Sequence, residues 1–476
     1  MLDKKLLPLF IAMLFIAGEA LADNSYLPSV AQVRVTSYTY SIGHPWHKGS
    51  AGKSFGSAVF IDNGRLLTNA HVIDSALRVE LRRAGSDKWY RASIEHVSEA
   101  SDLAMLKVAD DEFYVGSKPS RLSSEIHFGT EVVVVGFPEG GNTVSITKGV
   151  LSRTEETHYA YSGAKQLAYQ IDAAINSGNS GGAVFSSGEL VGVSFQTLEE
   201  AENLGYAIPV SIIEQFIADT ADGVVDGVPQ LPFIYQAITN ANMHAYLGLS
   251  EQSGAYISET VGDSNASCVK RGDAIIAING KQISAHGKVE LPEARTVSID
   301  YIASTQQVGD SVEMTLVRDG KELSITCSLK YNWNNLWGAA GINYQYLPKW
   351  VEVGGLILVD VSEEVFLRAE AYGVDFDKVA TEYRHGLQKG TLDLPEGVIW
   401  VSNVLDHDAN QGYEVEYSIL KTVNGEKVDN VKSINEIRAN NTSPWLILEF
   451  YGGALAVFKQ SELERITQDL SGEYGI

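Results

Sequence analysis

Short runs of apolar and β-branched residues, separated by turns of Gly, Asn and Asp, dominate the first half of the chain. Three of these runs are Ser57–Ile61, Glu131–Val135 and Leu190–Phe195. Runs of this length that are bounded by turn residues are typical of all-β sandwiches and barrels. We therefore predict that residues 28–215 form two β-barrels of about six strands each.

The pattern changes after this region. Apolar residues recur at helical spacing within Val210–Ala218, which predicts a short helix. The next stretch, Thr220–Pro232, is rich in Asp, Gly and Pro and is predicted to be a linker. A chain of 476 residues is long enough for about three domains, and we expect residues 23–220 to form the first.

An internal similarity organises the rest of the chain. The turn in Ile278–Ile283 is repeated in Thr422–Val428, and each copy precedes a predicted helix. We therefore expect residues 333–476 to repeat the fold of residues 233–332, with a charged, helical insertion near Glu363–Glu396.

The first 22 residues have the pattern of a secretion signal. Lys4 and Lys5 precede the apolar stretch Leu6–Ala17, and the small residues Ala20-Leu21-Ala22 follow. The apolar stretch is short for a membrane span, so an uncleaved anchor is the alternative reading. No later segment offers a second span. We expect the mature chain to be exported, and periplasmic if the source is a Gram-negative bacterium.

The charge of the chain argues against nucleic acid as a partner. The chain has 36 Lys plus Arg against 60 Asp plus Glu, a net charge of −24. Removal of residues 1–22 leaves this value unchanged, because Lys4 and Lys5 cancel Asp3 and Glu19. A polyanion would be repelled.

Two cysteines, Cys268 and Cys327, are the only ones in the chain. In an oxidising compartment they can pair. Both also lie in segments with a core-like pattern, where buried free thiols are common. The sequence leaves both readings open.

Three polar residues lie at positions suited to nucleophilic catalysis. Ser180 lies in the flexible run Gly178–Gly182, and His71 and Asp102 each flank an apolar, strand-like run. A serine hydroxyl needs an imidazole to accept its proton, and the imidazole needs a carboxylate to fix its tautomer. We assign these catalytic roles to Ser180, His71 and Asp102.

Backbone N–H groups beside the nucleophile are expected to stabilise the developing oxyanion. We place this oxyanion hole at Gly178, Asn179 and Ser180, with the N–H groups of Gly178 and Ser180 as donors. His44 and His47 have no further ligand at metal spacing, so we expect a surface loop there. Neither a metal nor another cofactor is expected.

The order His, Asp, Ser along the chain is the order found in chymotrypsin-like proteases, whereas subtilisins and α/β-hydrolases have other orders. Within that class the chain resembles the HtrA/Deg serine proteases, enzymes of protein quality control, closest in pattern to the plant-type Deg branch. Ala183 departs from the family pattern, which usually has proline there. The resemblance rests on an ordered series of motifs: Leu67–His71, Ser101–Ala104, Val135–Pro138, Thr147–Arg153, Gln170–Gly182 and Gly205–Pro209.

The resemblance implies a mostly β protein, in which a chymotrypsin-like double β-barrel is followed by a PDZ domain at 233–332 and a divergent, PDZ-like α+β domain at 333–476. It implies an ATP-independent serine endopeptidase that degrades misfolded or unfolded exported proteins. It also implies a homotrimer or a multiple of trimers, for which Tyr38, Tyr40 and Trp46 are candidate contacts. A non-proteolytic PDZ chaperone or scaffold is the alternative.

The same resemblance places the specificity pocket. Ala174, six residues before the nucleophile, stands where a carboxylate would select Lys or Arg. Val193, Ser194 and Phe195 are expected to form a wall strand whose bulk makes the pocket shallow and apolar. Cleavage after small or medium aliphatic residues follows.

The PDZ domain is expected to capture peptide C-termini as an added strand. We place its carboxylate-binding loop at Tyr246, Leu247, Gly248 and Leu249, although internal packing of the two leucines is the alternative. Residues 333–476 show no clear loop of this kind, so docking or assembly is the expected role of that domain.

Overall fold

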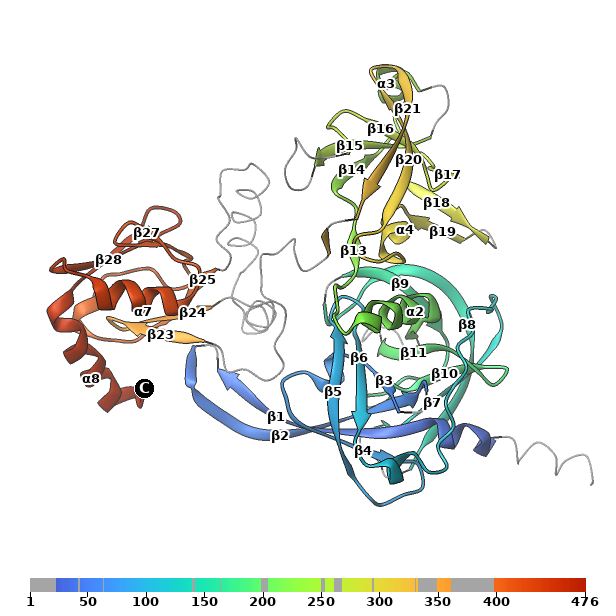
Figure 1. The fold of residues 1–476 in the computed structure, drawn as a ribbon, viewed down its shortest axis with the longest axis horizontal. Helices are drawn as coiled ribbons and strands as arrows, with labels where there is room; N and C mark the ends of the chain where they lie inside the picture. The colour runs from blue at the N-terminus through green and yellow to red at the C-terminus, as the bar shows by residue number, and fades with distance from the viewer. Residues whose placement is uncertain are drawn as a thin grey trace, which may run out of the picture. The chain divides into compact units, whose positions relative to one another are not determined.

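The computed structural model describes residues 23–41, 43–62, 64–138, 141, 143–162, 164–197, 204–249, 253–260, 268–292, 295–329, 331–332, 349–360 and 398–476. The expected signal segment, residues 1–22, and the expected insertion, Glu363–Glu396, lie outside these residues. The prediction of a mostly β protein with two barrels is confirmed, because two closed barrels of six strands each occupy the first half (Figure 1).

The first barrel follows the short helix η1 (Asp23–Ser29). Helix η2 (His71–Ile73) lies between two of its strands, and helix η3 (Asp111–Tyr114) follows its last strand along the chain. Strand β3 is fully buried and β6 has one exposed position, as expected for strands covered on both faces. In spatial order the strands are β1 (Val30–Ser41), β2 (His44–Phe60), β3 (Leu66–Thr68), β6 (Leu103–Val108), β5 (Tyr90–Ser98) and β4 (Ala76–Arg83).

The second barrel ends in helix α2 (Val210–Asp219), which confirms the helix predicted from the apolar spacing. Its buried residues include Ile212, Ile213 and Phe216, and these pack into the same core as residues of both barrels. In spatial order the strands are β10 (Ala183–Ser186), β11 (Glu189–Thr197), β12 (Gly205–Pro209), β9 (Lys165–Ile171), β8 (Ser145–His158) and β7 (Glu131–Gly136).

The next domain is built on a sheet in which β14 and β21 are the edge strands and β15 is internal. Helices α3 (Ala241–Leu247) and α4 (Asp300–Ser304) accompany this sheet, and η5 (Thr220–Asp222) and β13 (Pro229–Gln230) precede it. The strands are β14 (Phe233–Ala237), β15 (Ala255–Thr260), β16 (Ala274–Ile278), β17 (Lys281–Gln282), β20 (Ser311–Arg318) and β21 (Lys321–Ser328), with a separate hairpin of β18 (Lys288–Leu291) and β19 (Arg295–Ser298).

A disulfide stabilises this domain internally, and hydrogen bonds attach it to the second barrel. Cys268 and Cys327 form a disulfide, with a Cα–Cα distance of 5.4 Å, so the question that the sequence left open is answered in favour of pairing. Glu156 on β8 accepts hydrogen bonds from the backbone N–H of Ser298 at 2.7 Å and from its hydroxyl at 2.5 Å. These bonds join the domain to the second barrel, and both belong to one compact unit.

The C-terminal domain contains helices α7 (Val431–Asn440) and α8 (Leu463–Tyr474) and the short helices η8 (Asp408–Asn410) and η9 (Gln460–Glu462). One sheet has the order β23 (Trp350–Val353), β24 (Leu356–Asp360), β25 (Ile399–Val404), and the other has the order β27 (Glu426–Lys427), β26 (Leu420–Val423), β28 (Trp445–Phe450), β29 (Leu455–Lys459). Strand β22 (Tyr331–Asn332) precedes them.

The predicted repeat of a turn is present in the structure. Asn279 and Gly280 have φ angles of 46° and 73°, and Asn424 and Gly425 have φ angles of 50° and 82°. Each Asn side chain also accepts a hydrogen bond from a backbone N–H of a neighbouring strand, at 2.9 Å and 2.8 Å. Asn and Gly are the residues that adopt these left-handed angles most readily, which explains why the turn is visible in the sequence.

Candidate active site

Strand pairing brings His71 and Asp102 together. Strand β3 runs antiparallel to β6, with Thr68 opposite Ala104. His71 follows the end of β3, and Asp102 precedes the start of β6. The two residues therefore lie at the same end of the strand pair, although 31 positions separate them in the chain.

Asp102 holds His71 by two hydrogen bonds. Its Oδ2 lies 2.7 Å from Nδ1 of His71, and its Oδ1 accepts the backbone N–H of His71 at 2.9 Å. The side chain of Asn69 donates to the carbonyl of Asp102 at 2.9 Å. Since Nδ1 faces a carboxylate, the neutral ring carries its proton there, and Nε2 is the atom that can accept a proton.

The backbone of Asp102 is held in a sparsely populated conformation, with φ of 50°. Its side chain is 1% exposed. Asp tolerates the left-handed region better than most residues, and backbone strain of this kind clusters at functional sites. Here it turns a buried carboxylate toward the imidazole.

The net effect of the surroundings raises the pKa of His71 above its ordinary value. Burial alone lowers the pKa, because it disfavours the charged ring. The negative charge and the hydrogen bond of Asp102 oppose this effect, with a smaller contribution from Asp74, and they outweigh it. The site therefore stabilises an imidazolium, which is the state that forms when His71 accepts a proton.

The loop around Ser180 depends on glycines with positive φ. Gly178 and Gly181 have φ angles of 91° and 80°. A Cβ atom at Gly181 would collide with the carbonyl oxygen of Ser57 and with the hydroxyl of Thr68. Only glycine fits this close approach.

In this conformation the Ser180 hydroxyl donates to the carbonyl of Phe195, at 3.3 Å. Among the described residues no hydrogen bond joins Ser180 to His71. The hydroxyl must therefore rotate toward Nε2 of His71 before the imidazole can take its proton.

The N–H groups of Gly178 and Ser180 have no hydrogen-bond partner within the described part of the chain. They are available to an oxyanion. Asn179 differs, because its N–H closes a turn on the carbonyl of Asn176 at 2.9 Å. The inclusion of Asn179 in the oxyanion hole is therefore corrected: its backbone shapes the turn, and only its two neighbours offer donors.

Ser57 is a functional candidate that the sequence reasoning missed. Its hydroxyl donates to the carbonyl of Gly178 at 2.8 Å and accepts the N–H of Phe137 at 2.8 Å. Its own N–H donates to the carbonyl of Ser180 at 2.8 Å. Ser57 is fully buried, and a polar side chain in an apolar strand is a signal that it has a partner to hold.

The residues expected to form the specificity pocket are divided between surface and core. Ala174 is half-buried, and its carbonyl accepts the hydroxyl of Thr147 at 3.1 Å. The ring of Phe195 is 3% exposed and lies 4.5 Å from the ring of Tyr159. Phe195 therefore fills the core, and its carbonyl, not its ring, faces the nucleophile. Val193 and Ser194 are also fully buried.

The segment Tyr246–Leu249 does not have the structure of a carboxylate-binding loop. Tyr246 and Leu247 end helix α3, and Gly248 is its C-cap with φ of 69°. The strand that follows, β15, is hydrogen-bonded on both sides, to β14 and β16. A peptide can add only to a free edge, so the geometry does not support the expected role of this segment.

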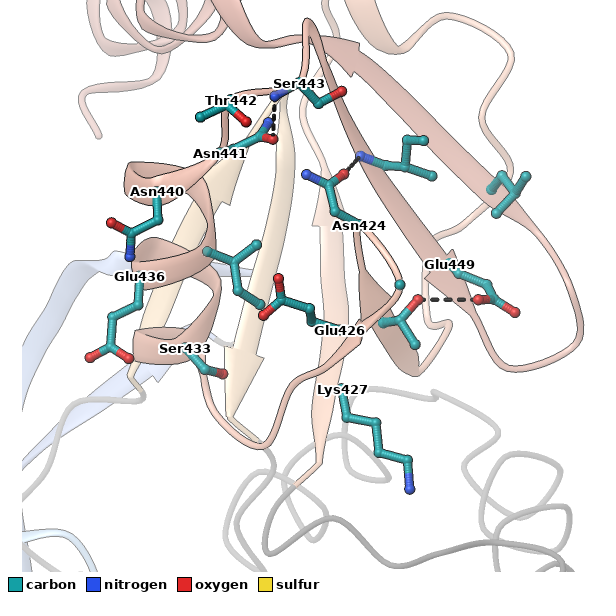
Figure 2. Close-up of a pocket in the computed structure, with 15 residues that line it drawn as sticks. Asn424, Glu426, Lys427, Ser433, Glu436, Asn440, Asn441, Thr442, Ser443 and Glu449 are labelled. Atoms are coloured by element: carbon teal, nitrogen blue, oxygen red, sulfur yellow. Dashed lines mark hydrogen bonds between the residues drawn. The ribbon is translucent and has the colours of Figure 1, made fainter.

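A pocket of about 710 Å³ lies in the C-terminal domain (Figure 2). Glu436 and Asn440 line it from α7, and Asn424 and Glu426 line it from the repeated turn. Its lining is mostly polar and includes none of the three candidate catalytic residues, so it is not the site of the chemistry.

Neither a metal site nor a membrane-spanning helix is found in the part of the chain that the structure describes. No group of three or more His, Cys, Asp and Glu side chains is arranged to bind a metal ion there. No helix among the same residues is both long enough and apolar enough to cross a membrane.

Comparison with known proteins identifies the class. Residues 56–193 match the trypsin-like peptidase domain, and residues 342–476 match the PDZ domain. A variant of the HtrA-type protease AlgW, solved with a decapeptide, superimposes with a TM-score of 0.51 at 21% identity, covering 63% of this chain and 94% of that one. This likeness supports the fold.

Several relatives extend over most of this chain. "Protease Do-like 2, chloroplastic" of Arabidopsis thaliana is 31% identical over 95% of this chain and 75% of its own length. A Marinomonas protein named probable periplasmic serine endoprotease DegP-like is 30% identical over 71% of this chain and 70% of its own. The protein is a chymotrypsin-like serine endopeptidase. It belongs to the HtrA/Deg family of proteases, as the sequence motifs predicted.

Proposed function

We propose that the protein degrades misfolded or unfolded exported polypeptides without ATP, and that it does so with Ser180, His71 and Asp102. The observation that carries the proposal is the His71–Asp102 pair, held by two hydrogen bonds at the end of the β3–β6 strand pair. Residues of these types perform peptide-bond hydrolysis on several unrelated folds, and the order His, Asp, Ser is the one found in chymotrypsin-like proteases.

The proposed chemistry follows from this arrangement. Ser180 Oγ attacks the scissile carbonyl carbon while Nε2 of His71 takes its proton, and the carbonyl π electrons move onto oxygen. The N–H groups of Gly178 and Ser180 stabilise that oxyanion. The C–N bond then breaks as His71 returns the proton to the leaving amine, and water releases the acyl group by the same two steps.

Reduced casein tests this proposal. The native chain is expected to digest it without ATP, and Ser180→Ala is expected to lose about 10⁴-fold or more in rate while remaining folded. Retention of most activity by a contaminant-free Ser180→Ala preparation would show that another residue is the nucleophile.

Substrate preference is part of the proposal. Ala174 offers no buried carboxylate to a Lys or Arg side chain, so we propose cleavage after Val, Ile, Ala or Leu. Unfolded proteins expose such residues, whereas folded proteins bury them. A profile of cleaved peptides dominated by basic or aromatic residues at that position would refute the preference.

The domain at 233–332 is proposed to bind peptide C-termini, with a site different from the one expected from the sequence. Strand β14 is hydrogen-bonded only to β15 within the described sheet, so its other edge can accept an added strand. The Tyr235 side chain on β14 donates to Asp300 of α4 at 2.7 Å. A peptide with a free carboxyl end should bind Ser180→Ala full-length protein more tightly than the same peptide with an amide end.

Export and a trimeric assembly complete the proposal. The relatives include proteins named chloroplastic and periplasmic. The signal-like pattern at residues 1–22 favours export for this chain. Mass spectrometry of the mature amino terminus and light scattering of the purified protein test the two statements separately.

A further inference from the structure

The tip of the β1–β2 hairpin groups with the C-terminal domain. Residues Ser37–Gly52 form one compact unit with Tyr331–Ile476, whereas the chain from Lys53 to Asp74 belongs to the other unit. Strand β2 (His44–Phe60) is thus one continuous strand whose first half is part of the C-terminal unit and whose second half is part of the peptidase barrel.

Trp46 anchors this tip by its ring and by its indole N–H. The N–H donates to the carbonyl of Tyr474 at 3.1 Å, and the ring centroid lies 5.3 Å from that of Trp350. The ring also packs against an apolar cluster whose fully buried members are Ile357, Val359, Trp400, Leu405, Ile466 and Leu470.

The carbonyl group that accepts the Trp46 N–H lies at the C-terminal end of a helix. Tyr474 is the last residue of α8. The last four carbonyls of a helix have no intrahelical donor, and a Trp combines a large apolar surface with one donor. The end of α8 therefore matches both properties of the indole.

A second contact fixes the tip to the sheet that also carries Trp350. The side chain of Asn403 on β25 donates to the carbonyl of Gly43 at 2.9 Å. Between these two contacts Pro45 is buried, and the ring of His44 packs edge-on against Trp46 at 5.4 Å. The tip thus presents a defined surface to the C-terminal domain over four consecutive residues, 43–46.

The far end of β2 reaches the candidate active site. Ser57, thirteen residues after His44, donates its hydroxyl to the carbonyl of Gly178 at 2.8 Å and its N–H to the carbonyl of Ser180 at 2.8 Å. A single strand therefore carries both the anchored tryptophan and the serine that holds the nucleophile loop.

We propose that the C-terminal domain is a receptor for the hairpin tip of its own chain, with Trp46 as the anchor, and that the docked tip steadies β2 and with it the loop of Ser180. The sequence predicted a docking role for the C-terminal domain, and the proposal names the hairpin tip as the segment that docks there. The effect on catalysis rests on the proposed function, whereas the docking does not.

The docking is tested by a disulfide. An added Cβ at Gly43 would lie 3.9 Å from Cβ of Asn403, within the range of about 3.5–4.5 Å found in disulfides. Gly43→Cys with Asn403→Cys is expected to link within one chain on mild oxidation. The native cysteines are already paired, so a peptide map by mass spectrometry identifies the new bond.

Gly52→Cys with Asn403→Cys is the matched control, because an added Cβ at Gly52 would meet only the carbonyl of Ser37 within 4.0 Å. Addition of Trp46→Ala to the linking pair should slow the link by about tenfold or more, as expected for an aromatic anchor. The docking is overturned if the linking pair stays reduced, links two chains into a dimer, or links no faster than the control.

The effect on the active site is tested by rescue. Trp46→Ala is expected to lower kcat for a short reporter peptide by about threefold or more, because the local opening of the hairpin becomes frequent. In the chain that also carries Gly43→Cys and Asn403→Cys, oxidation should restore kcat, and reduction should remove the gain. No restoration in a fully linked sample overturns the coupling, whereas an efficient link in a native chain that cleaves nothing contradicts only the proposed function.

Discussion

Replacement of Ser57 by alanine should show how much the hydrogen bonds that hold the oxyanion hole contribute to catalysis, because it leaves Ser180, His71 and Asp102 unchanged. The change removes a hydroxyl that bridges the carbonyl of Gly178 and the N–H of Phe137, each at 2.8 Å. Ser57 is fully buried, and Phe137 is 1% exposed. The two backbone groups would therefore lose a partner that water cannot readily replace.

The size of the effect follows from these two bonds. An unsatisfied buried polar group costs about 1–3 kcal/mol, so the loss of a partner by two such groups should lower the free energy of unfolding by roughly 2–6 kcal/mol. Removal of a whole oxyanion donor typically costs about 100- to 1000-fold in kcat. Because the backbone bond from Ser57 to Ser180 remains, we expect a smaller loss in kcat, about 10- to 100-fold, with KM changed by less than about twofold.

The assay is steady-state cleavage of a short reporter peptide well below the melting temperature, together with the rate of labelling of Ser180 by a fluorophosphonate. Ser186→Ala is the matched control, since Ser186 is also buried on a barrel strand and donates to a backbone carbonyl, that of Glu131, at 3.0 Å. If Ser57→Ala and Ser186→Ala lower the melting temperature alike and both keep kcat within about twofold of the native value, Ser57 serves stability alone and the reasoning is wrong.

Four further predictions rest on the same geometry. Asp102→Asn should lower the pKa of His71, and it should lower kcat by roughly 10⁴-fold because the imidazole loses the carboxylate that fixes its tautomer. A pH profile of peptide cleavage should show the acidic limb at lower pH, and an unmoved limb would contradict the pairing. The pKa of His71 is raised in the folded state. Its pairing with Asp102 should therefore stabilise the fold fully at pH values below the unfolded pKa of about 6.5, and this stabilisation should be lost as the pH rises through the folded pKa. Urea unfolding of the native chain and of Asp102→Asn at several pH values measures the effect. Cleavage of the Cys268–Cys327 bond should destabilise its domain by about 4 kcal/mol in the chain-entropy picture, because 59 positions separate the two residues, and melting curves with and without reductant measure the loss. Gly181→Ala should abolish cleavage, because its φ of 80° and its contact with two neighbouring oxygens leave no room for a Cβ; a well-folded and active variant would show that the loop moves freely.

The sequence predicted those features whose signal is local. Apolar runs bounded by turn residues indicated the barrels, helical spacing indicated α2, and the Asn-Gly pairs indicated two matching turns. His71 and Asp102 were also recognisable, because each candidate lies beside a strand-like run of its own.

Features that depend on strand order could not be predicted from the sequence. The segment Tyr246–Leu249 was assigned to peptide binding because it precedes a strand, yet that strand, β15, is internal to its sheet and the free edge belongs to β14. Likewise Ser57 lies 121 positions from the Gly178 carbonyl that it holds. No local pattern encodes such a distance, although a buried polar residue within an apolar strand suggests that a partner exists.

The pairing of the two cysteines could not be predicted from the sequence either. A buried thiol and a disulfide have the same apolar neighbours along the chain, so the pattern around Cys268 and Cys327 is compatible with both. What decides between them is the distance between their backbones, 5.4 Å from Cα to Cα, which lies within the range that a disulfide spans.

The resting state of the site combines two observations that bear on how catalysis starts. The Ser180 hydroxyl is held by the carbonyl of Phe195 at 3.3 Å, a long and therefore weak bond for a hydroxyl donor. The raised pKa of His71 at the same time favours a protonated ring, which cannot accept a proton from Ser180. After rotation toward His71, the Ser180 hydroxyl can donate a hydrogen bond to Nε2 only when the ring is neutral, because a protonated ring can only donate there. The protonation state of His71 therefore decides whether Ser180 is a hydrogen-bond donor or acceptor at Nε2, and only the neutral ring can activate it.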